Sequence, residues 1–113
     1  MSRASQRPAG LARSAPVFAA LGDETRLALL SRLCEGGALS TAQLTGGTDI
    51  SRQAVTKHLD VLAGAGLVHD VRRGRERRWE LAPGRLAEAR RTMDELSRRW
   101  DEALLRLRAL VEE

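Results

Sequence analysis

The sequence predicts a mainly α-helical domain with one small β-hairpin. Three observations support this prediction. Apolar residues recur at helical spacing through the first half of the chain, an alternating basic segment around Gly74 has the pattern of a hairpin, and the C-terminal segment repeats apolar positions in heptads. At 113 residues the chain has room for one domain with a modest core, so an oligomer interface would be a natural supplement.

The N-terminal segment is basic and contains no acidic side chain as far as residue 16. We expect residues 1–14 to form a disordered arm, although the composition also suits an organellar transit peptide. The single cysteine excludes an internal disulfide and fits a reducing compartment, so the cytoplasm is the expected location. The apolar runs are far shorter than the ~20 residues needed to cross a bilayer, so no membrane partner is expected.

Two helices are predicted on either side of Gly22, at the start of a domain expected over residues 15–82. Asp23 can cap the second helix by accepting a hydrogen bond from a free backbone N–H group. One face of this helix consists of Leu27, Leu30, Leu33 and Cys34. The position of Cys34 on this apolar face predicts that it is a small buried residue and not a redox sensor.

Two further helices are predicted to form a helix-turn-helix. Ser40 and Gln43 have the spacing of a capping box, and Ser51 is the N-cap in the stretch ISRQAVTKHLDVLAGAGLV. The intervening TGGTD favours a turn, so the first of these helices should be short. One stripe of the second helix is apolar and contains Val55, Leu59 and Leu62. The opposite stripe is polar and contains Arg52, Gln53, Thr56, Lys57 and Asp60.

The segment LVHDVRRGRERRWEL predicts a hairpin that turns at Gly74. Its central part, RRGRERR, has five Arg against one Glu. The apolar residues at alternating positions are Leu67, Val71, Trp79 and Leu81. We expect His69 to be a half-buried strand residue. A strongly basic hairpin directly after a helix makes a wing whose charge suits a polyanion.

Residues 83–113 are predicted to form one long C-terminal dimerisation helix. Apolar residues repeat over four heptads, and at ~1.5 Å per residue the helix would reach about 40 Å, beyond what the compact remainder could cover. The stripe should therefore meet a second copy of the chain. The residues expected in the dimer interface are Leu86, Met93, Leu96, Trp100, Ala103, Leu107 and Leu110.

The polar stripe after Ser51 has the side chains that reading the major groove of DNA requires. Arg pairs bidentately with guanine and Gln with adenine, and the free N–H groups at the helix start favour a phosphate. The arginines of the hairpin would lie on the adjacent backbone or in the minor groove. A merely solvated charged face is the alternative, and the basic hairpin beside it argues against this. The expected DNA-binding residues are Ser51, Arg52, Gln53, Thr56, Lys57, Arg72, Arg73, Arg75, Arg77 and Arg78.

These segments together resemble the ArsR-type winged helix-turn-helix regulators of prokaryotes over about residues 15–82. The motifs that carry the resemblance are VFAALGDETRLALLSRLCEGG, LSTAQL, ISRQAVTKHLDVLAGAGLV and RRGRERRWEL. It implies a homodimeric repressor whose first and last helices form the interface, with the recognition helix at residues 51–57 and the wing at 67–81. The cysteine pair and the acid and His ligands of metal-sensing members are not found in the sequence, so no metal or other cofactor is expected.

The expected fold is therefore a winged helix-turn-helix dimerised by its terminal helices, and the expected function is regulation of transcription at an inverted-repeat operator in double-stranded DNA. The alternative is an interaction module whose heptad helix pairs with a different protein and whose wing gives only general DNA affinity. An enzyme is not expected. The single Cys and two dispersed His offer no nucleophile and base pair, and the sequence has no Walker-type phosphate loop.

We expect Zn²⁺ to leave the affinity for DNA unchanged, because one Cys and two separated His cannot supply four nitrogen and sulfur ligands within one chain. The measurement is a titration of Zn²⁺ into a DNA-binding assay. A shift in affinity of about tenfold would contradict this expectation.

Overall fold

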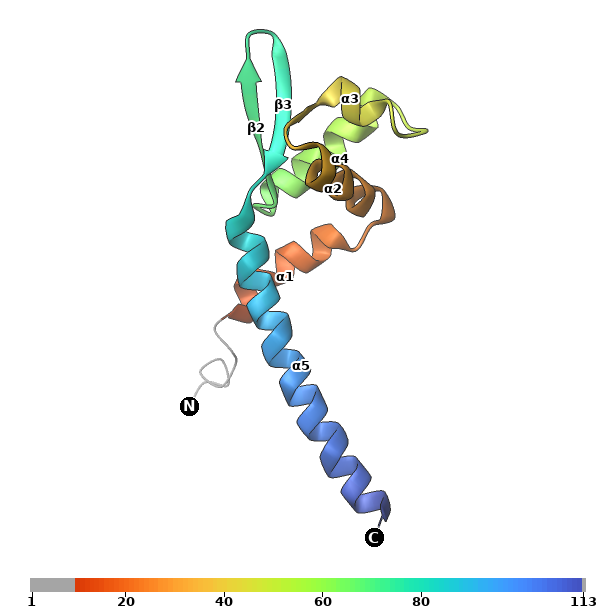
Figure 1. The fold of residues 1–113 in the computed structure, drawn as a ribbon, viewed down its shortest axis with the longest axis vertical. Coiled ribbons are helices and arrows are strands. Elements are labelled where there is room, and N and C mark those ends of the chain that lie inside the picture. The colour runs from red at the N-terminus through yellow and green to blue at the C-terminus, as the bar shows by residue number, and fades with distance from the viewer. Residues whose placement is uncertain (1–9, 113) are drawn as a thin grey trace.

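The structure is a computed structural model that describes residues 10–112. Figure 1 shows a compact group of helices and a hairpin at one end, from which a long C-terminal helix projects. The elements are α1 (Gly10–Leu21), α2 (Glu24–Gly36), β1 (Leu39–Ser40), α3 (Thr41–Thr45), α4 (Arg52–Gly64), β2 (Val68–Arg73), β3 (Glu76–Leu81) and α5 (Pro83–Glu112). The predicted mainly α fold with a hairpin wing is confirmed. In the described part of the chain, no helix is long and apolar enough to cross a membrane.

Helix α1 begins at Gly10, so residues 10–14, which we expected to be disordered, are helical. The reason is tertiary contact with α5. Ser14 is buried, and its hydroxyl lies 3.0 Å from Oγ1 of Thr92. A Cβ atom on Gly10 would lie 2.5 Å from the same oxygen, so glycine permits this close approach. The rest of the predicted arm, residues 1–9, lies outside the described residues.

Asp23 is the N-cap of α2, as predicted. Its carboxylate accepts a hydrogen bond from the backbone N–H of Arg26 at 3.0 Å, and this bond holds the pKa of Asp23 below its usual value. The prediction that Cys34 is buried is wrong, because its thiol-bearing side chain is exposed. The core side of α2 passes through Leu29 and Leu33, with Leu30 packed against its edge, and Cys34 lies outside this covered stripe.

Helix α3 has only five residues, and both of its ends are stabilised by side chains. Its N-terminus has the predicted capping box, in which Ser40 Oγ accepts from the N–H of Gln43 and Gln43 Oε1 accepts from the N–H of Ser40. At its C-terminus Arg32 of α2 donates to the carbonyl oxygens of Gln43 and Leu44 at 2.8 and 2.6 Å. These are carbonyl groups that a short helix leaves without intrahelical partners. The unusual turn is thus held by a residue from the preceding helix.

The sheet has three strands in the order β1-β3-β2. Strand β1 was not predicted, because two residues are too few for a periodic pattern. Asp70 of β2 lies opposite Trp79 of β3, and residues opposite each other share a face of the sheet. Val71, which the sequence pattern grouped with Trp79 at alternating apolar positions, lies opposite Arg78 and therefore on the other face from Trp79. His69 is exposed and pairs with Glu80, in contrast to the half-buried residue we expected.

The core forms around Trp79, which has no exposed surface. The three apolar residues predicted on α4 are all buried: Val55, Leu59 and Leu62. They pack with Trp79 and with apolar residues of α1 and α2. The indole Nε1 of Trp79 donates to Oγ1 of Thr41 at 3.0 Å, which satisfies the one polar atom of this buried ring. Because its inner stripe is buried here, α4 keeps its polar stripe on the outside.

Helix α5 has the predicted extent, but only its first half packs against the domain. Helix α1 lies beside this half, and beyond it α5 projects away from the compact group (Figure 1). The buried residues of α5 are Ala89 and Thr92. Trp100 is 69% exposed, and the other large apolar residues exposed along α5 are Leu86, Met93, Leu96, Leu104, Leu105, Leu107, Leu110 and Val111.

Replacing Gly47 with Ala should lower the free energy of unfolding by about 1 kcal/mol, because the new Cβ would displace Arg32 from its two carbonyl acceptors. That Cβ would lie 2.6 Å from Nη1 of Arg32. Gly46→Ala is the matched control, since position 46 has φ −59° and its Cβ would meet no atom closer than 3.5 Å. This control should gain roughly 0.4–1 kcal/mol. Denaturant unfolding measures both changes.

The same measurement in an Arg32→Ala background tests the cause. With Arg32 truncated, Gly47→Ala should no longer lower stability beyond the loss from Arg32 itself. Losses from the two changes that simply add would show that Arg32 does not hold this turn.

Candidate nucleic-acid interface

The polar stripe of α4 lies at the start of the helix and faces away from the core. Ser51 is the N-cap, and its Oγ accepts from the N–H of Ala54 at 3.1 Å. The capping fixes where the helix begins and therefore which side chains stand on its first two turns. Four of the predicted residues line one open concavity of about 610 Å³: Arg52, Gln53, Thr56 and Lys57. The structure thus brings together the stripe that the sequence indicated.

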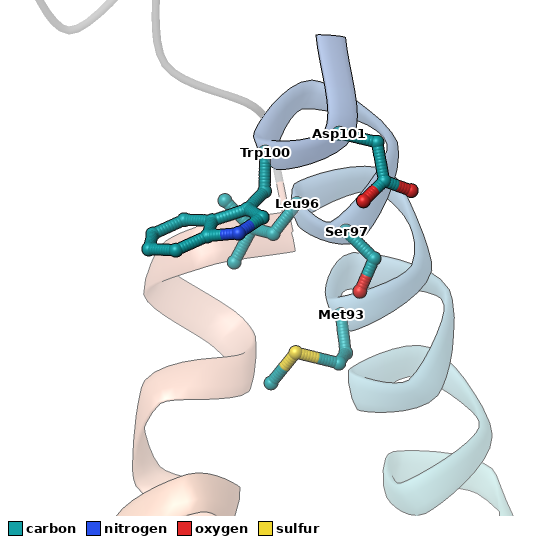
Figure 2. Close-up of a pocket in the computed structure, with 5 residues that line it drawn as sticks. All are labelled: Met93, Leu96, Ser97, Trp100 and Asp101. Carbon is teal, nitrogen blue, oxygen red and sulfur yellow. The ribbon is translucent and has the colours of Figure 1, made fainter. Parts of the chain in front are cut away.

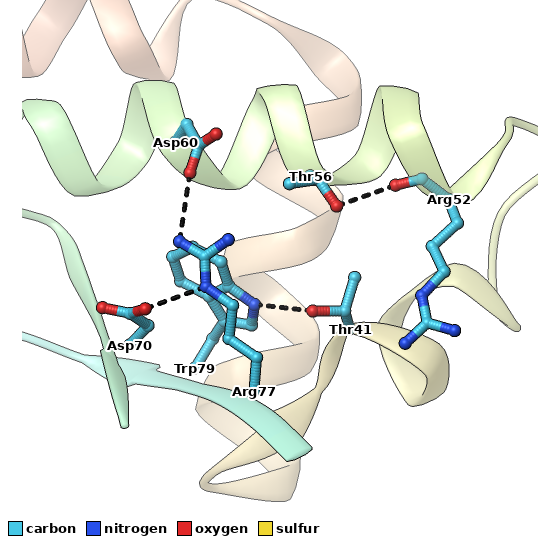
Figure 3. Close-up of polar contacts among 7 residues, drawn as sticks. All are labelled: Thr41, Arg52, Thr56, Asp60, Asp70, Arg77 and Trp79. Carbon is cyan, nitrogen blue, oxygen red and sulfur yellow. Dashed lines mark hydrogen bonds and ion pairs between the residues drawn. The ribbon is translucent and has the colours of Figure 1, made fainter. Parts of the chain in front are cut away.

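Within this stripe the four side chains differ in how free they are. Arg52, Gln53 and Lys57 are exposed, whereas Thr56 is half-buried. The hydroxyl of Thr56 donates to the carbonyl oxygen of Arg52 at 2.9 Å, as Figure 3 shows. This bond along the helix uses the only proton of the hydroxyl and leaves its lone pairs to accept. Arg52, Gln53 and Lys57 are therefore the donors of this surface.

The wing carries its exposed positive charge at its tip. The hairpin turns at Gly74, which has φ +63° and meets the need of this turn for a left-handed residue. Arg72, Arg73 and Arg75 are exposed, and they form no ion pair within residues 10–112. Arg78 is half-buried, and its Nε lies 3.3 Å from Oε2 of Glu76. Three arginines at the tip thus remain available to an anion.

Arg77 differs from the other arginines of the wing. Its Nε donates to Oδ2 of Asp70 at 2.8 Å, and its Nη2 lies 3.4 Å from Oδ1 of Asp60 on α4. Its guanidinium carbon lies 4.3 Å from the centre of the Trp79 ring (Figure 3). Arg77 was expected to bind DNA with the others, but it is occupied by groups of its own chain. A correct strand register would have predicted the pair of Arg77 with Asp70, since Arg77 lies diagonally across the strands from Asp70.

The stripe of α4 and the wing lie at the same end of the molecule. Figure 1 shows the hairpin and α3 both projecting away from α5, with α4 leading from the turn after α3 to the base of β2. This end presents cationic and amide side chains from two elements. It contains no candidate metal centre, since no group of three or more His, Cys, Asp or Glu side chains in residues 10–112 is placed to hold an ion.

Comparison with known proteins points in one direction. The model of a helix-turn-helix domain family matches residues 21–71. The HTH-type transcriptional regulator Rv2034 of Mycobacterium tuberculosis is 39% identical over 93 residues, which cover 82% of this chain and 83% of the relative. The arsenical resistance operon repressor of Escherichia coli is 34% identical over 79 residues, covering 70% of this chain and 68% of the repressor.

Solved structures agree with these relatives. An ArsR-like transcriptional regulator from Rhodococcus sp. RHA1 superimposes with a TM-score of 0.73 at 37% identity, covering 88% of this chain and 92% of that protein. The homodimeric winged helix-turn-helix DNA-binding domain of Mb0332 from Mycobacterium bovis shares the fold, with a TM-score of 0.64 at 24% identity. That match covers 92% of this chain and 90% of the domain.

Proposed function

Because this chain belongs to the ArsR-type winged helix-turn-helix regulators of transcription, we propose that it is a homodimeric repressor that binds an inverted-repeat operator in cytoplasmic double-stranded DNA. The observation that carries this proposal is the exposed stripe at the start of α4, at the same end of the molecule as a wing tip whose three arginines form no ion pair within residues 10–112. The E. coli relative is itself named a repressor, which favours repression.

In this proposal the first two turns of α4 enter the major groove. Arg52 has the two donors that pair bidentately with guanine, and Gln53 has the donor and the acceptor that pair with adenine. Lys57, one turn further along, suits a phosphate as a compact point charge. Ser51 holds the N–H of Ala54, so the N–H groups nearest the helix start remain free to meet a phosphate of the DNA backbone.

The wing contributes charge to the same complex. Arg72, Arg73 and Arg75 are placed at the hairpin tip, from which they can contact the backbone or enter the minor groove beside α4. These contacts add affinity for DNA of any sequence, whereas the side chains on α4 carry the choice of sequence.

The dimer is proposed from the uncovered stripe of α5. Its apolar side chains extend over several turns, a contiguous exposure that marks an interaction surface. The stripe contains a concavity of about 200 Å³ in which a side chain of a second copy can pack. It is lined by Met93, Leu96, Ser97, Trp100 and Asp101. Figure 2 shows Met93 and Trp100 projecting to the side of α5 on which α1 lies. Two copies related by a twofold axis would present two recognition helices, which requires an inverted repeat.

Base-reading and charge-providing residues should fail differently. Changing Arg52 or Gln53 to Ala should cost roughly 1–3 kcal/mol on the preferred operator and relax the choice of particular base pairs. Changing Arg75 to Ala should weaken binding to all duplexes evenly and flatten the salt dependence, because one phosphate contact is lost. The measurement is binding to a duplex selected from a random pool and to a scrambled duplex, at several salt concentrations. Equal losses on both duplexes for the Arg52 and Gln53 variants would show that α4 does not read bases.

The double variant Leu96→Glu/Trp100→Glu should be monomeric and should lose operator binding, because four buried carboxylates in the dimer would be without partners. Arg98→Glu, on the opposite face of α5, is the control and should remain a dimer. Light scattering at micromolar concentration measures the mass. A wild-type monomer would refute the dimer, and a stable complex with a different protein would favour the interaction-module alternative.

A further inference from the structure

We propose that Arg77 is a positioning residue that fixes the wing against the recognition helix α4, in place of contacting DNA. This inference rests on the proposed function and adds to it a residue that determines specificity. It sets where the basic tip stands relative to α4, so that the wing can hold backbone phosphates while Arg52 and Gln53 reach their base edges, although Arg77 itself reads no base.

The contacts of Arg77 join three elements. The residue belongs to β3, donates to Asp70 on β2 at 2.8 Å and reaches Asp60 on α4 at 3.4 Å. Its side chain is 33% exposed, and its planar guanidinium lies over the Trp79 ring (Figure 3). Two of its three nitrogens thus have carboxylate partners, and the indole supports the group from below. The tip arginines have no such partners among the described residues.

Strand β3 is fixed a second time, two residues further along. Trp79 donates from its indole to Thr41 at the start of α3, while Arg77 on the same face of the strand reaches Asp60 on α4. One strand is therefore connected to both helices of the helix-turn-helix. Together with the pairing of β1 to β3 at Trp79 and Arg78, these two contacts restrict the movement of the hairpin relative to the helices. The connection to α4 is the one that links the wing to the base-reading helix.

The chemistry of this position favours arginine. A guanidinium can stack on an aromatic face while its edge donates to two carboxylates in different directions, which a lysine ammonium cannot do with the same geometry. The hydrogen bond from Arg77 holds the pKa of Asp70 below its usual value, because it stabilises the ionised carboxylate. The two carboxylates also offset the positive charge of Arg77, which would otherwise attract a phosphate of the DNA backbone. A single exposed ion pair contributes little to the stability of the fold. The effect that we assign to this cluster is therefore on the orientation of the wing relative to α4.

The test compares two variants that each lose one positive charge from the hairpin. Arg75→Gln should reduce the slope of log affinity against log salt by about 0.9 and should weaken the operator and a scrambled duplex alike. Arg77→Gln should leave this slope at the wild-type value and should lower operator affinity by about tenfold more than affinity for the scrambled duplex, which loses only the general attraction of one charge. A slope reduced as in Arg75→Gln, or unchanged discrimination between the duplexes, would overturn the proposal.

The carboxylate partner supplies an independent arm. Removing a negative charge near DNA should by itself strengthen binding to every duplex. For Asp70→Asn we expect a lower ratio of operator to scrambled affinity, because the wing loses its fixed position. In the double variant Arg77→Gln/Asp70→Asn this ratio should fall no further than in Arg77→Gln alone, whereas losses that simply add would overturn the coupling.

Arg77→Lys keeps the charge and protects the test against an unfolded Arg77→Gln protein. It should keep the wild-type salt slope and still lose discrimination, and full wild-type discrimination would overturn the geometric argument.

The proposed function and the role of Arg77 are refuted by different results. A wild-type protein that does not distinguish operator from scrambled duplex refutes the proposed function. Wild-type and Arg75→Gln proteins that behave as expected, beside a fully discriminating Arg77→Gln, refute this inference alone.

Discussion

The burial of Trp79 determines how the sheet meets the helices. It is the largest fully buried side chain of the described chain, and its indole reaches Thr41 with the only polar atom it has. Core residues of α2 and α4 pack with it on the inside, and the guanidinium of Arg77 covers it from the outside. Because so large a ring fits close-packed surroundings in few ways, the hairpin and the two helices of the motif are held in one arrangement.

Local patterns predicted most of the fold because they depend on neighbours in the chain. The caps at Asp23, Ser40 and Ser51 and the apolar stripe of α4 are set by spacings of three or four residues, and the structure has them as predicted. The features that the sequence did not reveal depend on contacts between distant residues. The start of α1 is stabilised by α5, strand β1 exists only as a partner of β3, and Cys34 is exposed because the covered side of α2 passes through Leu29 and Leu33.

The candidate interface shows the same division. A helical wheel was enough to place Arg52, Gln53 and Lys57 on one exposed surface, since the opposite stripe of α4 had to be buried. The wing could be recognised from its charge, but counting charges does not reveal which arginines have carboxylate partners. That distinction depends on the strand register, which puts Asp70 opposite Trp79 and which an alternating apolar pattern alone does not specify. A shift of one residue in a strand exchanges its two faces.

The uncovered half of α5 makes the stability of the proposed dimer depend on the concentration of the chain. The exposed apolar stripe of α5 leaves water only when another chain covers it, so the binding of that chain stabilises the folded protein by mass action. In the proposed homodimer, halving a dilute supply of chains would leave only about a quarter of the paired form. Occupancy of a palindromic site would then fall more steeply than the protein level itself. The regulated gene would therefore respond to a change in protein concentration more steeply than in direct proportion, because only the dimer occupies the site.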